Sequence, residues 1–150
     1  MARIKKAQVV AMLTSPEDVE AQFYEALREG NLGKLMAVWA EDEEVVCIHP
    51  GGPRLVGPAA VRAAFEAVFS NGAVAVQPDN VRRVHAMGLA VHSVVEKVQI
   101  HTDQGPRLGY VMATNVYLKT SQGWRMVAHH ASPGTPNEPP ELVETPSVLH

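Results

Sequence analysis

The stretch from Leu89 to Ala131 reads LAVHSVVEKVQIHTDQGPRLGYVMATNVYLKTSQGWRMVAHHA. It contains three long runs rich in β-branched and aromatic residues, separated by DQGP at 103–106 and TSQG at 120–123. Such runs are typical of strands, and the Gly-containing and Pro-containing breaks are typical of turns. With a further run at about 73–86, the pattern predicts four long antiparallel strands. A shorter strand is expected at about 44–49, ending in the turn sequence HPGGP at 49–53.

Helices are expected before these strands. Ser15 can cap a helix whose first residue is Pro16, and Asn31 can cap a short second helix. A third helix is expected after Gly57-Pro58, where apolar residues recur at helical spacing. Helices followed by a run of antiparallel strands indicate the α+β class, with the three N-terminal helices packed on one face of the antiparallel sheet.

Composition narrows the class of protein. The chain has 150 residues, which fits one domain, and its formal net charge of −3 argues against a nucleic-acid surface. No apolar run reaches the length of a membrane span, so we expect neither membrane nor nucleic-acid partners and a cytoplasmic location. Cys47 is the single cysteine, which rules out an internal disulfide, and its apolar run predicts a small buried hydrophobe.

The ends of the chain differ from its middle. Residues 1–14 are expected to form an N-terminal extension and residues 15–132 the domain itself. Residues 133–150 hold five of the eleven prolines, so this segment is expected to be an extended arm that contributes little to the core.

The hairpins predict which side chains share a sheet face. If DQGP and TSQG are four-residue loops, Glu96 lies opposite Ala113, and Ala113 lies opposite His130. Asn115 then shares their face, while His129 points to the other face. Two-residue loops preserve this parity, whereas a three-residue loop or a β-bulge breaks it. Small alanines between longer polar residues predict a hollow that can take a ligand.

The opposite sheet face is also apolar, with residues such as Val95, Met112 and Val116. A sheet covered by helices on one side needs a second covering layer when its other side is apolar. This predicts a homodimer formed through the outer sheet face.

Several segments carry a family resemblance. They are FYEALREGNL at 23–32 with WAED at 39–42, IHPGG at 48–52, ATNVY at 113–117 and GWRMVAHHAS at 123–132. In order and spacing the sequence resembles the SnoaL-like and ketosteroid isomerase-like families, and also the association domain of calcium/calmodulin-dependent kinase II. The resemblance implies the cone-shaped nuclear transport factor 2-like (cystatin-like) fold, with a ligand pocket in its curved sheet.

The resemblance also bears on chemistry. Matched by spacing, the oxyanion-binding tyrosine of ketosteroid isomerases falls at Phe23, the strand acid at Asn115 and the base at His49. Phe23 has no hydroxyl and Asn115 does not titrate, so steroid isomerisation is not expected. The kinase association domain carries pocket arginines where this chain has Glu96 and Asn115, which argues against an anionic pocket ligand.

The candidate site combines these arguments. His49 and His130 are the candidate acid/base residues, because they titrate near neutral pH. The candidate ligand-binding residues are Asn115, Glu96, Tyr24, Trp39, Phe23 and Phe65. The alternatives remain open: His49 can be a turn residue, and His130 can pair with Glu96 as a structural contact.

No cofactor or metal is expected. The sequence has no HExxH or CxxC motif, and a set of His49, Glu96 and His130 would require the first helix-strand corner to fold right over the sheet.

The sequence predicts a protein that binds a small, mostly apolar molecule, with possible acid/base chemistry such as isomerisation, cyclisation or hydration. The alternative is a non-catalytic dimeric association or ligand-sensing module. The residues alone leave open whether the protein is an enzyme.

Overall fold

The computed structural model describes residues 13–144. Its helices are α2 (Pro16–Glu29), α3 (Leu32–Met36) and α4 (Pro58–Phe69). Its strands are β1 (Val46–Ile48), β2 (Arg54–Val56), β3 (Val76–Ala86), β4 (Leu89–Thr102), β5 (Gly105–Thr120) and β6 (Gly123–Ala131). The predicted N-terminal extension lies outside the described residues, apart from its last two positions.

The predicted helix starts are confirmed. The Ser15 hydroxyl accepts a hydrogen bond from the backbone N–H of Asp18, and Pro16 is the first helical residue of α2. Asn31 caps α3 in the same way through the backbone N–H of Lys34. Gly30 ends α2 in the left-handed conformation at φ 64°, which glycine adopts without steric cost.

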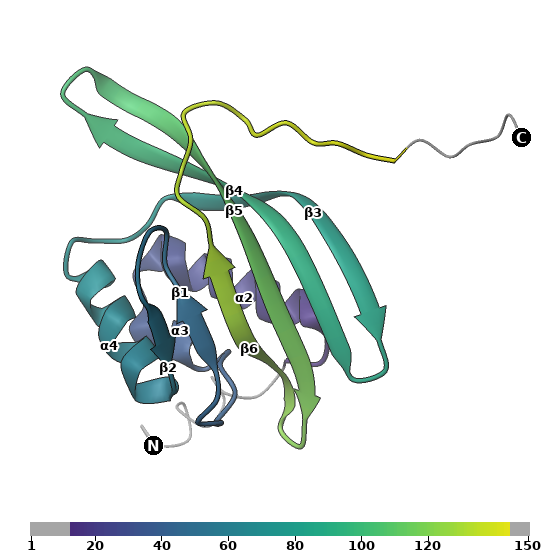
Figure 1. Ribbon diagram of the computed structural model, residues 1–150. Coiled ribbons are helices and arrows are strands. Elements are labelled where there is room, and N and C mark those ends of the chain that lie inside the picture. Colours follow the sequence, from purple (N-terminus) through teal and green to yellow (C-terminus); the bar gives the residue numbers. More distant parts are fainter. Residues whose placement is uncertain (1–12, 145–150) are drawn as a thin grey trace, which may run out of the picture.

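The strands form one six-stranded sheet in the order β2-β1-β6-β5-β4-β3. All neighbouring pairs are antiparallel except β1 and β6, which run parallel. The long strands curve around the helices, which all lie on one side of the sheet (Figure 1). This arrangement is the α+β architecture that the sequence predicts, with a concave inner face toward the helices.

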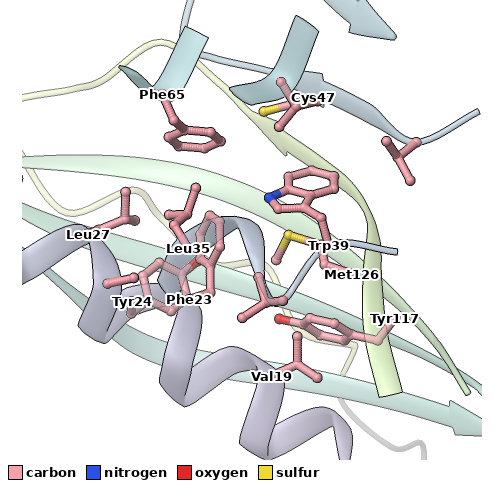
Figure 2. Close-up of a cluster of buried hydrophobic side chains, with 14 of the residues drawn as sticks. Val19, Phe23, Tyr24, Leu27, Leu35, Trp39, Cys47, Phe65, Tyr117 and Met126 are labelled. Carbon is pink, nitrogen blue, oxygen red and sulfur yellow. The ribbon is translucent and has the colours of Figure 1, made fainter. Parts of the chain in front are cut away.

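The main hydrophobic core lies between α2 and the inner face of the sheet. Figure 2 shows side chains of α2, among them Phe23 and Tyr24, packed near Trp39 and Met126. All four side chains are buried, and the rings of Phe23 and Tyr24 meet edge to face at 5.0 Å between centroids. Burial of such large aromatic side chains supplies much of the stability of a domain of this size.

The hairpin loops are shorter than the four-residue loops of the sequence analysis. Thr102 pairs with Gly105 and Thr120 pairs with Gly123, so each turn has two residues. Glu96 therefore lies opposite Val111 rather than Ala113. Because two-residue and four-residue loops preserve the same parity, the prediction that Glu96 and Asn115 share a face holds.

A β-bulge overturns the prediction for β6. Tyr117 pairs with Met126, but Val116 pairs with Ala128, so Val127 is an extra residue in β6. The extra residue reverses the parity beyond it. His129 pairs with Asn115 and is buried on the inner face, whereas His130 is exposed on the outer face. The prediction that His130 faces the cavity and His129 faces away from it is therefore wrong: the two histidines lie on the opposite faces.

The C-terminal arm is extended, and its first residues pair with the sheet. Thr135 and Tyr110 exchange two backbone hydrogen bonds of 2.8 Å. The arm then crosses the sheet toward β3 (Figure 1), where the Glu141 carboxylate accepts from the guanidinium of Arg82 at 2.7 Å. Within residues 13–144, no helix is long and apolar enough to cross a membrane.

Candidate functional site

A large cavity opens on the inner face of the sheet, with a volume of about 620 Å³. Its walls come from α2, α4, the β4–β5 hairpin, the end of β6 and the start of the C-terminal arm. Most of the lining is apolar: Phe23, Leu27, Phe65, Val68, Val74, Val76, Val98, Ile100, Leu108, Val111 and Ala131. A cavity of this size and composition fits a small, mostly apolar molecule.

Three side chains capable of acid/base chemistry near neutral pH interrupt this apolar lining: Glu96, His49 and His129. Glu96 comes from the middle of β4, His129 from β6, and His49 from the turn directly after β1. The His49 ring packs edge to face with the ring of Phe65, and the centroids of the two rings are 4.8 Å apart. The His129 ring packs on Phe23 with the ring centroids 5.0 Å apart. These contacts hold both imidazoles in place at the cavity wall.

Behind the wall, Glu96 and His129 are joined by a continuous chain of hydrogen bonds. The Tyr24 hydroxyl donates to Oε2 of Glu96 at 2.7 Å, and Nδ2 of Asn115 donates to the Tyr24 hydroxyl at 3.0 Å. Nδ1 of His129 lies 2.5 Å from Oδ1 of Asn115. An amide oxygen can only accept, so Nδ1 of His129 carries the proton and Nε2 keeps a lone pair.

Burial changes the proton affinities of these groups. It raises the pKa of the Glu96 carboxyl to about 7, with the hydrogen bond from Tyr24 opposing the shift. Burial, together with the nearby His49 and His130, lowers the pKa of His129 to about 3, and burial alone lowers the pKa of His49. At neutral pH the two histidines are uncharged, while Glu96 is populated in both its protonated and its ionised form.

The structure brings four of the predicted site residues to the cavity: Phe23, Phe65, His49 and Glu96. Asn115 and Tyr24 are fully buried behind the wall, where they bond to the lining residues. Trp39 is buried in the core against Met126, away from the cavity lining, and the exposed His130 is on the other face of the sheet.

Sequence reasoning missed three parts of the cavity. His129 was placed on the wrong face because nothing in the sequence marks the bulge at Val127. Arg107 lies at the exposed end of the β4–β5 hairpin, where its guanidinium donates to Gln104 and lines the cavity. The arm lines it through 134–136, and the backbone pairing of Thr135 with Tyr110 gives no sequence signal.

Cys47 is placed as the sequence predicts, as a small buried hydrophobe. Its side chain is inaccessible, and burial, with a smaller contribution from the Glu96 charge, raises the thiol pKa to about 12. A thiol with so high a pKa is a poor nucleophile.

Comparisons with known proteins agree on the fold. The family model described as a SnoaL-like domain matches residues 17–136. None of the curated proteins matches the chain. Among solved structures, a candidate calcium/calmodulin-dependent protein kinase type II association domain from Thiobacillus denitrificans is 39% identical, with a TM-score of 0.74. That match covers 81% of this chain and 97% of the other.

Two further structures are similar. A protein from Streptomyces avermitilis, described as a candidate dehydratase of the nuclear transport factor 2-like family, is 26% identical over 77% of this chain and 90% of its own, with a TM-score of 0.69. The hub of calcium/calmodulin-dependent kinase II from S. rosetta is 20% identical over 83% of this chain and 100% of its own, with a TM-score of 0.64. The chain therefore belongs to the SnoaL-like domain family and has the nuclear transport factor 2-like, cystatin-like fold.

Proposed function

We propose that the cavity binds a small, mostly apolar or polycyclic molecule and that Glu96 exchanges a proton with it. The observation that carries this proposal is a single buried carboxyl, with a pKa of about 7, facing a mostly apolar cavity. A general acid or base works best when its pKa lies near the working pH. Isomerisation, cyclisation and dehydration all need a proton moved at carbon or oxygen, which is the step that Glu96 would perform.

The neighbouring residues have distinct parts in this proposal. Tyr24 and Asn115 are positioning residues, because they hold Glu96 and His129 through hydrogen bonds and do not line the cavity. The free Nε2 lone pair of His129 is an acceptor for a ligand hydroxyl. Phe23 contributes an apolar wall and cannot donate to an oxyanion, which separates this site from steroid isomerisation. A dehydratase assignment for the relative from Streptomyces avermitilis supports proton-transfer chemistry.

A bicyclic ketone, 2-tetralone, tests binding. Ala131 lines the cavity, so Ala131→Phe would place a ring in the space that the ketone needs. The matched control is Ala128→Phe, in the same strand but on the outer face beside Val116. Calorimetry at pH 7 should find that Ala131→Phe weakens binding at least about tenfold while Ala128→Phe does not. Equal affinities for the two variants would place the ketone outside the cavity.

Proton transfer is tested with the same ketone. Its α-protons exchange with D₂O when a base removes them, and proton NMR follows their loss against a buffer control. We expect the protein to accelerate exchange and Glu96→Gln to lower that acceleration by roughly 10²-fold or more. Unchanged exchange in Glu96→Gln would mean that Glu96 does not move the proton. Binding without any acceleration by the wild type would leave a binding protein without this chemistry.

A second candidate function is self-association as an assembly module. Four apolar side chains on the outer sheet face are exposed, namely Val84, Leu89, Met112 and Leu118, with Met112 40% exposed. The relative from Thiobacillus denitrificans is named for an association domain. These observations favour pairing of two copies through the outer face. Val95 is nevertheless already buried within one chain, so the exposed patch is smaller than the sequence suggests.

Sedimentation at micromolar concentration tests this second candidate. The intact protein should sediment as a dimer or a larger assembly. Met112→Lys should shift the equilibrium toward the monomer, because assembly would then bury the charge of the lysine in the contact. Gln122→Lys, at the exposed β5–β6 turn, adds the same charge away from the patch and should leave assembly unchanged. A monomeric wild type would exclude assembly through this face.

A further inference from the structure

A second group of polar side chains gathers where the first turn of α2 meets the inner face of β3 and β4. It consists of Glu17 and Glu20 from α2, Arg83 and His85 from β3, and His92 from β4. None of these side chains lines the large cavity. The proposed function therefore makes no use of them.

Three of these residues converge with the geometry of metal ligands. Oε2 of Glu17 lies 3.3 Å from Nε2 of His85 and 3.5 Å from Nε2 of His92. The three ligand atoms all lie within 4.8 Å of one another. Two ligand atoms at about 2.0–2.1 Å from a tetrahedral zinc ion are separated by roughly 3.3–3.4 Å. The distances from Oε2 of Glu17 to the Nε2 atoms of His85 and His92 are already close to this ligand–ligand separation.

His92 is built to serve as the anchor of such a site. Its side chain is completely inaccessible, and its Nε2 atom has no hydrogen-bond partner among residues 13–144. Its Nδ1 atom is 2.8 Å from Oε1 of Glu20, and its ring packs at a steep angle on the ring of Tyr117, with the centroids 4.9 Å apart. A carboxylate on one imidazole nitrogen holds the other nitrogen in the orientation and protonation state that a metal ion requires.

The other two ligands can adjust to an ion. His85 is stacked on His92 with an interplanar angle of 8° and centroids 5.7 Å apart, so its ring must turn to bring its lone pair onto a shared ion. The side chains of His85 and Glu17 are about half exposed, at 48% and 47%, which leaves room for that rotation and for a water molecule as a further ligand.

The local charge favours a cation. The carboxylates of Glu17 and Glu20 both face the group, and the guanidinium of Arg83 lies 3.7 Å from each of them. With neutral histidines, one negative charge remains uncompensated. The Arg83 side chain is 43% exposed, so it can move away from an incoming ion.

We propose that Glu17, His85 and His92 form a binding site for a divalent transition-metal ion such as Zn²⁺, with Glu20 orienting His92 from behind. Two imidazoles and one carboxylate suit zinc and its neighbours in the first transition row, rather than Mg²⁺ or Ca²⁺, which prefer oxygen ligands. The site lacks a sequence motif, because the three ligands come from α2, β3 and β4 and meet through the pairing of the two strands.

Titration of Zn²⁺ into the full chain, free of tags and stripped of metal, tests the proposal. A chromophoric chelator competing for the ion reports stoichiometry and affinity, and we expect one Zn²⁺ per chain. His85→Ala and Glu17→Gln should each weaken binding at least about tenfold. His101→Ala removes another exposed histidine of β4 and should have no effect. Absence of stoichiometric binding, or equal affinity in His85→Ala, would overturn the proposal.

Cobalt provides a second readout that does not depend on activity. Co²⁺ in the proposed site should show the visible absorption of a four- or five-coordinate ion, and His85→Ala should abolish it. Glu20→Gln should weaken Co²⁺ binding by about 10–100-fold and alter the spectrum, because it changes the charge behind His92 while keeping an acceptor. A spectrum unaffected by both substitutions would mean that the ion binds elsewhere, contradicting the proposal.

Discussion

Replacing Glu96 by glutamine should change how the stability of the protein depends on pH. In the folded protein the carboxyl has a pKa of about 7, against an ordinary value of 4.5, because it is buried. A carboxyl whose pKa is raised by folding binds its proton more tightly in the folded state. Its stabilising contribution is therefore complete below pH 4.5 and disappears as the pH rises through 7.

The size of the effect follows from these two values. At about 1.4 kcal/mol for each pH unit, the interval between 4.5 and 7 corresponds to roughly 3 kcal/mol in total. Most of it falls between pH 5 and pH 8. Glutamine cannot titrate and still offers Tyr24 an acceptor. The unfolding free energy of Glu96→Gln relative to wild type should therefore rise by roughly 2–3 kcal/mol from pH 5 to pH 8.

Urea denaturation of both proteins at a series of pH values measures this difference, and subtraction cancels the contribution of every other titrating group. Glu25→Gln is the matched control. Its exposed carboxyl has a pKa lowered by hydrogen bonding and attraction to Lys34. The difference in unfolding free energy between Glu25→Gln and wild type should therefore be nearly constant above pH 5. If the unfolding free energy of Glu96→Gln relative to wild type is also constant with pH, the claim that burial raises the pKa of Glu96 is refuted.

Three further predictions concern the surroundings of Glu96. Tyr24→Phe should lower the unfolding free energy by about 1–3 kcal/mol in urea denaturation, because buried Nδ2 of Asn115 loses its acceptor; an unchanged value would contradict the hydrogen-bond chain. Nitrogen NMR should find His129 uncharged, with its proton on Nδ1, down to about pH 4, whereas titration near pH 6.5 would disprove its burial as described. Truncation after Glu138 removes the exposed Arg82–Glu141 pair and should cost no more than about 1 kcal/mol in urea denaturation; a loss of several kcal/mol would mean that the arm packs elsewhere.

Local signals explain why the helices were predictable. Capping by Ser15 and Asn31 depends on a side chain and a backbone N–H three residues away, so the chemistry is contained in a short window. The turns at 103–104 and 121–122 lie within the predicted breaks, and the shared face of Glu96 and Asn115 follows from parity alone.

The candidate site was harder to predict because it depends on nonlocal geometry. The extra residue at Val127 reverses the parity of β6, and neither glycine nor proline marks it, so the cavity holds His129 in place of His130. Neighbouring Phe23 and Tyr24 are both buried, yet only the packing of α2 on the sheet decides which lines the cavity and which bonds to Glu96. Sequence spacing carries no information on either point.

The most direct test of the proposed function is a carbon NMR titration of the Glu96 carboxyl, with and without 2-tetralone. The free protein should titrate at about pH 7, since burial sets the pKa of this group. Bound ketone should raise that pKa further for two reasons. The ketone oxygen accepts a hydrogen bond from the protonated carboxyl, and the bound molecule displaces water that would stabilise the ionised carboxyl. A titration midpoint near 4.5, unmoved by the ketone, would contradict both the protonation state of Glu96 and its place in a ligand site.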